Sequence, residues 1–209
     1  MWLLHSRHPG ARIILASGSA ARQQMLAAAG VQFQVETAQV DEAALKEGLF
    51  REAPCVSARQ IAQSLAAAKA RDVGGRNRNS YVIGCDQVLA CGERIFSKVA
   101  DRAGAQETLS ALRGKTHRLH SAVAIAFSGS VVWEDSEAAS LTMRNFSDAF
   151  LDRYLDAAGE ALTLSVGCYE LEGLGVQLFE CIEGDYFTIL GLPMMPLLAE
   201  LRKRGAIAS

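Results

Sequence analysis

The 209-residue sequence predicts an α/β fold with a mixed sheet, on the basis of three observations. Short apolar runs rich in β-branched residues, typical of buried strands, alternate along the chain with longer runs of helical periodicity. The Ser-Gly-Ser turn at 128–130 joins two apolar runs closely enough to form a hairpin, so the strands cannot all be parallel. No segment is rich enough in Pro, Gly or Ser to link two domains. We therefore expect a single α/β domain.

In the first half of the chain, the ends of the expected helices coincide with residues that favour helix termini. Gly30 is a C-cap, Pro54 opens a long helix, and Asp101 is an N-cap. The expected strands lie at 12–16, at 31–35 and from 82 onward, and the expected helices at 20–29, 43–50, 54–71 and 102–112.

In the second half, Ser147 is the expected N-cap of one helix, and Pro193 lies in the first turn of another. The expected strands lie at 121–127, 131–133, 138–143, 176–179 and 187–190, and the expected helices at 148–157 and from 193 onward. Residues 1–11 are expected to form a loose leader, which leaves 12–209 as the domain.

Composition excludes several classes of protein. A net charge of −2 without a basic block argues against nucleic-acid binding. The five cysteines lack zinc spacing, and we expect reduced, mostly buried thiols. No apolar run is long enough for a signal sequence or a membrane span, so we expect a soluble cytoplasmic protein.

Asp86 is the candidate chemical centre. It follows the apolar run that begins at Val82, where a buried strand would continue with apolar residues. A carboxylate in this position loses hydration, so it needs a partner, a metal or a catalytic task. Lys98, twelve residues later, is a candidate charge partner for Asp86 or for its substrate. Alternatively, Asp86 caps a turn and Lys98 is solvated.

A candidate anion site precedes the first helix. Ser17 and Ser19 lie in a turn between a strand and that helix, where free amides, hydroxyls and the helix dipole attract phosphate. Arg22, in the first helical turn, could reach the same anion. Alternatively, Ser19 is only an N-cap and Arg22 is solvated.

An acidic pair and a helical lysine complete the set of candidates. Asp41 and Glu42 either cap the helix that follows or supply oxygen ligands to magnesium. Lys69 shares a helix face with Ile61 and Leu65, so it either faces a polar cleft or offsets the helix dipole. Basic groups that hold a polyphosphate, together with acids that hold a metal and activate water, favour phosphoryl or nucleotidyl chemistry.

Other phosphate and hydrolase motifs are absent from the sequence. It has no Walker loop and no GxGxxG fingerprint, and its histidines give no Ser-His-Asp set. His117 and His120 are three residues apart on an expected strand, so they point to opposite faces and are poor co-ligands.

Ordered motifs from Ile13 to about Gly205 resemble the Maf-like nucleoside triphosphate pyrophosphatases. The matching segments are LASGSAAR at 15–22, DE at 41–42, KA at 69–70, GCDQ at 84–87, SKV at 97–99, LRGKTH at 112–117, YELEG at 169–173, GDY at 184–186 and GLP at 191–193.

The resemblance implies a long mixed sheet flanked by helices, with two lobes around a central nucleotide cleft. It implies hydrolysis of a nucleoside triphosphate to the monophosphate and pyrophosphate with Mg²⁺ or Mn²⁺, a homodimer, and a role in clearing modified nucleotides or in cell-division arrest. Asp86 would be the proton acceptor and, with Asp41 or Glu42, a metal ligand. The residues that would bind the triphosphate are Ser17, Ser19, Arg22, Lys69 and Lys98.

Several positions depart from the family pattern. Ala20 and Ala21 replace the usual Pro-Arg, and Val99 replaces a Pro. Gln87 and Glu172 are similar to the branch that cleaves 7-methyl-GTP, and both would bind the base. The base preference therefore stays open. A nucleotide-binding regulator of division without turnover and a phosphomonoesterase are the alternative functions.

Overall fold

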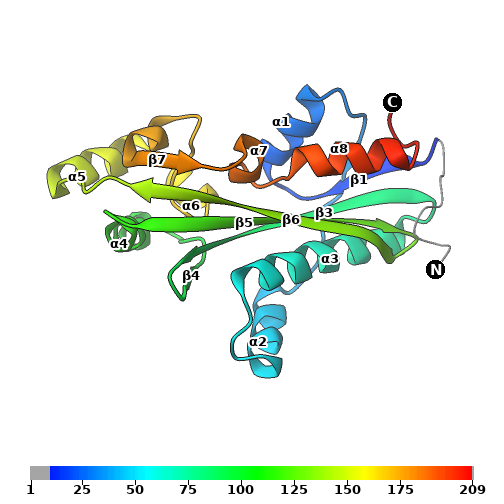
Figure 1. The fold of residues 1–209 in the computed structure, drawn as a ribbon, viewed down its shortest axis with the longest axis horizontal. Helices are drawn as coiled ribbons and strands as arrows, with labels where there is room; N and C mark the ends of the chain where they lie inside the picture. Colours follow the sequence, from blue (N-terminus) through cyan, green and yellow to red (C-terminus); the bar gives the residue numbers. More distant parts are fainter. Residues whose placement is uncertain (1–9, 209) are drawn as a thin grey trace. The chain divides into compact units, whose positions relative to one another are not determined.

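A computed structural model describes residues 10–208, and it confirms an α/β fold with a mixed sheet. The strands of this part of the chain are β1 Arg12–Ala16, β2 Gln34–Val35, β3 Ser80–Cys91, β4 Arg94–Phe96, β5 Thr116–Phe127, β6 Ser130–Met143 and β7 Phe179–Glu183. These seven strands form one sheet in the order β2-β1-β3-β5-β6-β7, with β4 paired to β3 beside that path (Figure 1). β1 is parallel to both of its neighbours, β2 and β3. β4 is antiparallel to β3, and β7 is antiparallel to β6.

Helices flank the sheet. Their bounds are α1 Ala20–Ala28, α2 Glu42–Glu52, α3 Ala58–Arg76, α4 Arg102–Leu112, α5 Asp148–Ala157, α6 Ala161–Leu164, η2 Leu174–Leu178 (a 3₁₀-helix), α7 Tyr186–Ile189 and α8 Met194–Lys203. α1 to α5 each follow a Ser or Asp whose side chain accepts a hydrogen bond from the backbone N–H three residues later. Each such cap stabilises its helix by about 1 kcal/mol, which explains why the helix starts are well defined.

The chain divides into two compact units. The first comprises residues up to Gln87 together with 120–137 and 186 onward, and the second comprises Val88–Leu119 and Ala138–Asp185. Strands β3, β5 and β6 contribute residues to both. The first unit contains α1, α2, α3, α7 and α8, and the second contains α4, α5 and α6, with α4 packed against both other helices.

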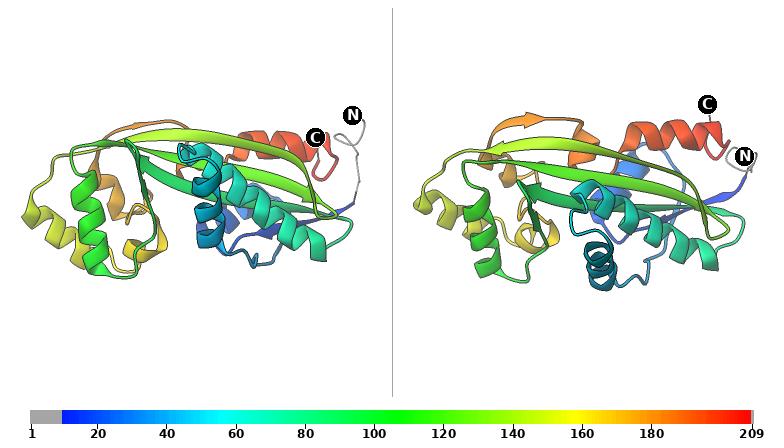
Figure 2. Two further views of the ribbon diagram at one scale, coloured as in Figure 1. Left: turned by 90° about the horizontal axis from the view of Figure 1, so that it is seen from below. Right: turned by 60° about the horizontal axis from the view of Figure 1, so that its bottom comes forward.

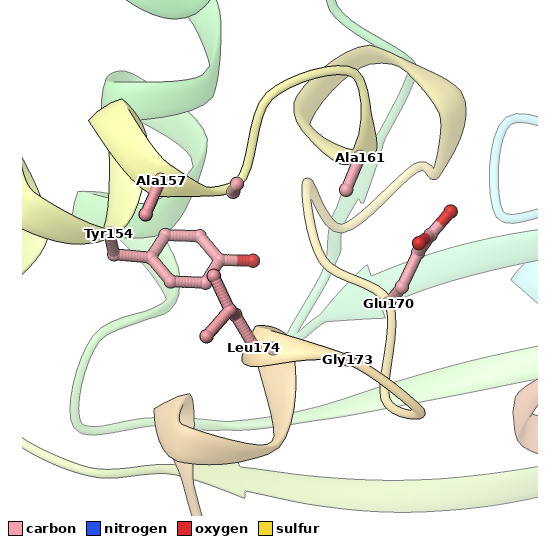
Figure 3. Close-up of a pocket in the computed structure, with 8 residues that line it drawn as sticks. Tyr154, Ala157, Ala161, Glu170, Gly173 and Leu174 are labelled. Carbon is pink, nitrogen blue, oxygen red and sulfur yellow. The ribbon is translucent and has the colours of Figure 1, made fainter.

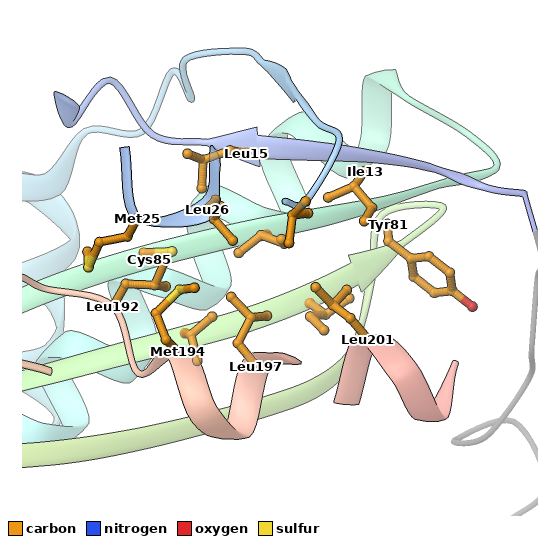
Figure 4. Packing of buried hydrophobic residues seen from close by; sticks show 14 residues of the cluster. Ile13, Leu15, Met25, Leu26, Tyr81, Cys85, Leu192, Met194, Leu197 and Leu201 are labelled. Atoms are coloured by element: carbon orange, nitrogen blue, oxygen red, sulfur yellow. The ribbon is translucent and has the colours of Figure 1, made fainter. Parts of the chain in front are cut away.

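The core of the first unit lies between the sheet and helices α1 and α8 (Figure 4). Alternate residues of β3 point into it, namely Tyr81, Ile83 and Cys85. Because side chains of a strand alternate between its faces, Gly84 and Asp86 point to the opposite face. That face is covered by α3, as Figures 1 and 2 show.

Several element predictions are wrong in detail. α3 begins after Ser57, not at Pro54, because Ser57 and Gln60 form a capping box, and it continues five residues beyond Arg71. The two strands expected at 131–133 and 138–143 are one continuous strand, β6. Of the strand expected at 187–190, residues 187–189 belong to the short helix α7, and residues 176–178 belong to a 3₁₀-helix, since short apolar runs are compatible with either helix or strand.

The cysteines are free thiols, as expected, but they are not mostly buried. Cys85 and Cys168 are buried, Cys91 is half-buried, and Cys55 and Cys181 are exposed. The leader expected at 1–11 lies outside the described residues except for its last two positions. Within the described part, no helix has both the length and the apolar character needed to cross a bilayer.

Candidate active site

Close packing of α3 on β3 places Lys69 beside Asp86. A Cβ atom on Gly84 would lie 2.2 Å from the carbonyl oxygen of Ala66 and 2.6 Å from the backbone nitrogen of Ala70. Only glycine therefore lets the helix lie this close to the strand. Lys69 lies between these two alanines on α3, and Asp86 is two residues beyond Gly84 on the same face of β3.

The Lys69 ammonium group joins two carboxylates. Its Nζ lies 2.6 Å from Oδ1 of Asp86 and 2.7 Å from Oε1 of Glu42. The side chains of Lys69 and Asp86 are 13% and 9% exposed, whereas that of Glu42 is 44% exposed. Burial lowers the pKa of Lys69, but the charges and hydrogen bonds of Asp86 and Glu42 together outweigh burial and raise that pKa above its ordinary value. Lys69 is therefore a fixed positive charge at neutral pH.

The charge partner of Asp86 in the first unit is Lys69. The sequence proposed Lys98 for this role, or for contact with the substrate. Lys98 follows β4 in the second unit, so its contact with the substrate stays a prediction. Lys69 was identified from its position on the apolar stripe of α3, where it was expected either to face a polar cleft or to offset the helix dipole. In the structure, Lys69 faces a polar site with two carboxylates.

The Ser-Gly-Ser turn at 17–19 begins where β1 ends, close to Asp86 in the middle of β3. Ala16 at the end of β1 pairs in parallel with Gly84, two residues before Asp86, whereas β3 continues to Cys91. Ser19 is the N-cap of α1, as one alternative held. The Oγ atom of Ser17, a residue only 7% exposed, accepts a hydrogen bond from the backbone of Ser19.

Arg22 is held in place by neutral oxygens, so the alternative of a solvated arginine is wrong. Its Nε donates to the carbonyl oxygen of Gly191 at 2.8 Å, and its Nη1 donates to Ser17 Oγ at 3.2 Å and to the carbonyl oxygen of Cys85 at 3.3 Å. Gly191 has φ +96°, and a Cβ there would lie 3.2 Å from Nη2 of Arg22, so glycine is required for both conformation and space. Among the described residues, no carboxylate forms an ion pair with this guanidinium. Its charge is thus available to an anion beside the N-terminus of α1.

Gln87 anchors the short helix α7. Its Nε2 donates to Ser121 Oγ at 2.9 Å and to the carbonyl oxygens of Thr188 at 3.1 Å and Ile189 at 2.9 Å. Thr188 in turn donates to Glu137 at 2.7 Å. The amide nitrogen of Gln87 is thus engaged by the protein, and a contact with a base through its amide oxygen stays a prediction.

The acidic pair has two different roles. Asp41 caps α2, accepting a hydrogen bond from the backbone of Ala44 at 2.9 Å, while Glu42 contacts Lys69. In the part of the chain that is described, no group of three or more His, Cys, Asp or Glu side chains is arranged to hold a metal. Asp86 and Glu42 nevertheless lie near each other, since both contact the Lys69 ammonium, and carboxylate oxygens are the ligands that Mg²⁺ takes together with phosphate oxygens and water.

Glu172 lies in the second unit, on an exposed turn closed by a hydrogen bond from the backbone of Gly173 to the carbonyl oxygen of Glu170. The partners that sequence reasoning missed are chiefly backbone carbonyls. Those of Cys85 and Gly191, which hold Arg22, carry no side-chain signal that a sequence pattern could reveal.

Known proteins similar to this chain carry related names. A family model described as Maf-like protein matches residues 12–204. A nucleoside triphosphate pyrophosphatase of Paramagnetospirillum magneticum is 53% identical over 194 residues, which are 93% of this chain and 99% of that protein. One of Bradyrhizobium diazoefficiens with the same name is 52% identical over 94% of this chain and 95% of that protein. A 7-methyl-GTP pyrophosphatase of Rhizobium meliloti is 47% identical over 93% of this chain and 97% of that protein.

Proposed function

Because the chain belongs to the Maf-like protein family, we propose that it is a nucleoside triphosphate pyrophosphatase, releasing a nucleoside monophosphate and pyrophosphate. The observation that carries the proposal is that a carboxylate and an anion-binding turn lie close together where β1 ends beside β3. A nearly buried carboxylate, Asp86, ends in a charged cluster beside a helix N-terminus that presents Ser17, Ser19 and Arg22. This arrangement suits a reaction in which an anionic chain is held while water is activated.

Asp86 is the proposed proton acceptor. Its Oδ1 is engaged by Lys69, which fixes the orientation of the carboxylate and leaves Oδ2 to accept a proton from water. The deprotonated water attacks the α-phosphorus, and the bond to the bridging oxygen of pyrophosphate breaks. Lys69, whose ammonium stays protonated, offsets the negative charge that develops in this step.

The turn before α1 is the proposed triphosphate cradle. Arg22 is held in place by Gly191 and Cys85, so little side-chain entropy is lost when it binds an anion. The Ser17 hydroxyl and the free amides at the start of α1 supply further donors. Lys98 of the second unit is a proposed further contact with the phosphates.

Asp86 and Glu42 are the proposed ligands of Mg²⁺ or Mn²⁺, because both carboxylates contact the same ammonium group of Lys69 and therefore lie near each other. Such an ion, when bound, would neutralise phosphate charge. Asp41 is the weaker candidate, since its Oδ1 accepts the cap hydrogen bond of α2. A homodimer stays a prediction from the resemblance, and a cytoplasmic location stays a prediction from the composition and the apolar runs of the sequence.

A preference for 7-methyl-GTP is the second proposal, and it concerns the same reaction. Glu172 supports it, because an exposed carboxylate could offset the positive charge of a methylated guanine ring. The name of the relative from Rhizobium meliloti supports it too, while other relatives with similar identity carry the broader name.

Product analysis tests the function. The purified protein is incubated with Mg²⁺ or Mn²⁺ and with dTTP, UTP, GTP or 7-methyl-GTP, and the products are separated by ion-exchange chromatography. Monophosphate and pyrophosphate in equal amounts are expected. Orthophosphate as the first product would instead indicate a phosphomonoesterase, and nucleotide binding without turnover would indicate a regulator.

A further inference from the structure

The segment between α6 and η2 in the second unit is organised around one buried side chain, Tyr169. Tyr169 is only 6% exposed, although the residues that follow it are on the surface. Its ring fills the space that a side chain at Gly167 would occupy, because a Cβ there would lie 2.3 Å from its Cε1. A Cβ on Gly175 would lie 2.4 Å from the carbonyl oxygen of Glu170 and 2.8 Å from the Cβ of Tyr169. Glycine at these two positions thus lets the loop pack closely around Tyr169.

The hydroxyl of Tyr169 is held by a buried histidine of β5. Nε2 of His117 lies 2.7 Å from Oη of Tyr169, and His117 is 1% exposed. The two rings pack against Phe179, which contacts Tyr169 edge-on at 4.8 Å between centroids. Burial lowers the pKa of His117 to about 4, so the imidazole is neutral at physiological pH. Neither His117 nor Tyr169 belongs to the cluster of Asp86, Lys69 and Glu42.

The backbone of the loop is fixed on both sides of Tyr169. Ser165 Oγ accepts from the backbone nitrogen of Tyr169 at 2.9 Å and donates to its carbonyl oxygen at 2.7 Å. The turn at 170–173 follows directly, closed by the hydrogen bond between Gly173 and Glu170. Glu172 belongs to this turn, so its direction depends on the position of Tyr169.

The side of the 170–173 turn that faces α5 and α6 is less densely packed. A cavity of about 100 Å³ lies between α5, α6 and the turn, lined by Tyr154, alanines, Glu170, Gly173 and Leu174 (Figure 3). Tyr154 holds the loop only before Tyr169, by donating to the carbonyl oxygen of Cys168 at 3.0 Å. The turn therefore has space to shift if its link to β5 is lost.

We infer that His117 and Tyr169 are positioning residues for base selectivity: their hydrogen bond holds the 170–173 turn so that the Glu172 carboxylate meets the base of the substrate. This inference rests on the proposed function and on the proposed contact of Glu172 with the base. The substrate class that it selects is a guanine-type base, which offers hydrogen-bond donors or, when methylated, a positive charge.

A Tyr169→Phe variant tests the inference, because it removes the hydroxyl and keeps the ring beside Gly167. We expect kcat/KM for the preferred triphosphate to fall by about three- to tenfold, the usual effect of one hydrogen bond, chiefly through a higher KM. The preference for that base over the others should fall by the same factor. Inhibition by inorganic tripolyphosphate, which has no base, should be unchanged.

A double-mutant cycle with Glu172→Gln shows whether Tyr169 acts through Glu172. If it does, adding Tyr169→Phe to Glu172→Gln causes little further loss of selectivity. The inference would be overturned if the selectivity losses of the two single variants multiplied in the double variant. It would also be overturned if Tyr169→Phe lowered kcat/KM equally for every base, or if either single variant kept the selectivity of the wild type. Failure of the proposed function is distinguishable, because the wild-type protein would then release no pyrophosphate from any triphosphate.

Discussion

The Lys69 side chain shows how much of the candidate site depends on a single charge. It lies between Asp86 and Glu42, and the loss of its ammonium group would leave two carboxylates facing each other with one of them nearly buried. Removing one partner of a buried ion pair is costly because the remaining charge has no compensation. Lys69 thus links the stability of the first unit to its proposed chemistry.

Replacement of Asp86 by Asn is expected to lower kcat by about two to four orders of magnitude, because the amide cannot accept the proton of water. Nucleotide affinity should largely persist, since Ser17 and Arg22 are unchanged. Single-turnover rates and nucleotide titrations measure the two effects. Asp156→Asn is the matched control, because Asp156 is an exposed residue of α5 whose ion-pair partner is Arg102 of α4. Equal rates for Asp86→Asn and the wild type would remove Asp86 from the mechanism.

Lys69→Met is expected to destabilise the protein by about 3 kcal/mol, the order found when one partner of a buried pair is removed. Urea unfolding measures this change. Lys69→Arg keeps the positive charge and should lose less stability, although its planar group cannot reproduce the geometry of the ammonium. If both variants are as stable as the wild type, the cluster contributes nothing to folding.

At the scale of elements, most segments were predictable where a local signal exists. The hairpin between β5 and β6 has positive φ at both Ser128 and Gly129; Gly129 favours this conformation, whereas Ser128 adopts it against the usual preference of serine. The helix starts at Asp101 and Ser147 coincide with the predicted caps. α7 and the continuous course of β6 were not predictable, because tertiary neighbours decide whether a short apolar or mixed segment becomes a helix or a strand.

Gly84→Ala is expected to disturb α3 as a whole, because the new methyl group would meet the backbone of the helix. Overpacking of this kind costs about 1–3 kcal/mol, and a shift of α3 would move Lys69 away from Asp86, so activity should fall as well. Thermal unfolding and turnover measure the two effects.

Gly48→Ala on α2 is the control for that substitution. Nothing lies within 4 Å of the added Cβ, and alanine favours a helix, so this variant should gain about 0.5–1 kcal/mol. Full stability and activity of Gly84→Ala would show that α3 can move without consequence.

At the scale of the molecule, the sequence supplied the members of the candidate site but not all of their partners. Lys69 was identified from its place on the apolar face of a helix and Arg22 from the first turn of another, whereas Asp86, expected where an apolar run ends, lies in the middle of β3. That they meet follows from the parallel pairing of β1 with β3 and from the helix that crosses at Gly84, neither of which a sequence pattern shows. Lys98 and Glu172 lie in the second unit, and their contacts with a substrate stay predictions from the sequence.

The stability of the whole protein is expected to depend on pH through His117. The folded state lowers the pKa of this imidazole from 6.5 to about 4, so between these values the unfolded chain binds a proton that the folded chain does not. The stabilisation is therefore complete above pH 6.5 and is lost as the pH falls toward 4. Between pH 7 and pH 5 the loss from this residue is about 2 kcal/mol.

His117→Gln isolates this contribution, because glutamine does not titrate and can still reach the hydroxyl of Tyr169. Urea unfolding of both proteins at pH 7 and pH 5 is expected to show a smaller acid-induced loss in the variant, whereas the carboxylates contribute equally to both. Parallel losses in the two proteins would mean that His117 binds its proton as readily in the folded as in the unfolded state. That result would contradict a neutral, buried imidazole as the partner of Tyr169, and with it the fixed position of the turn that carries Glu172.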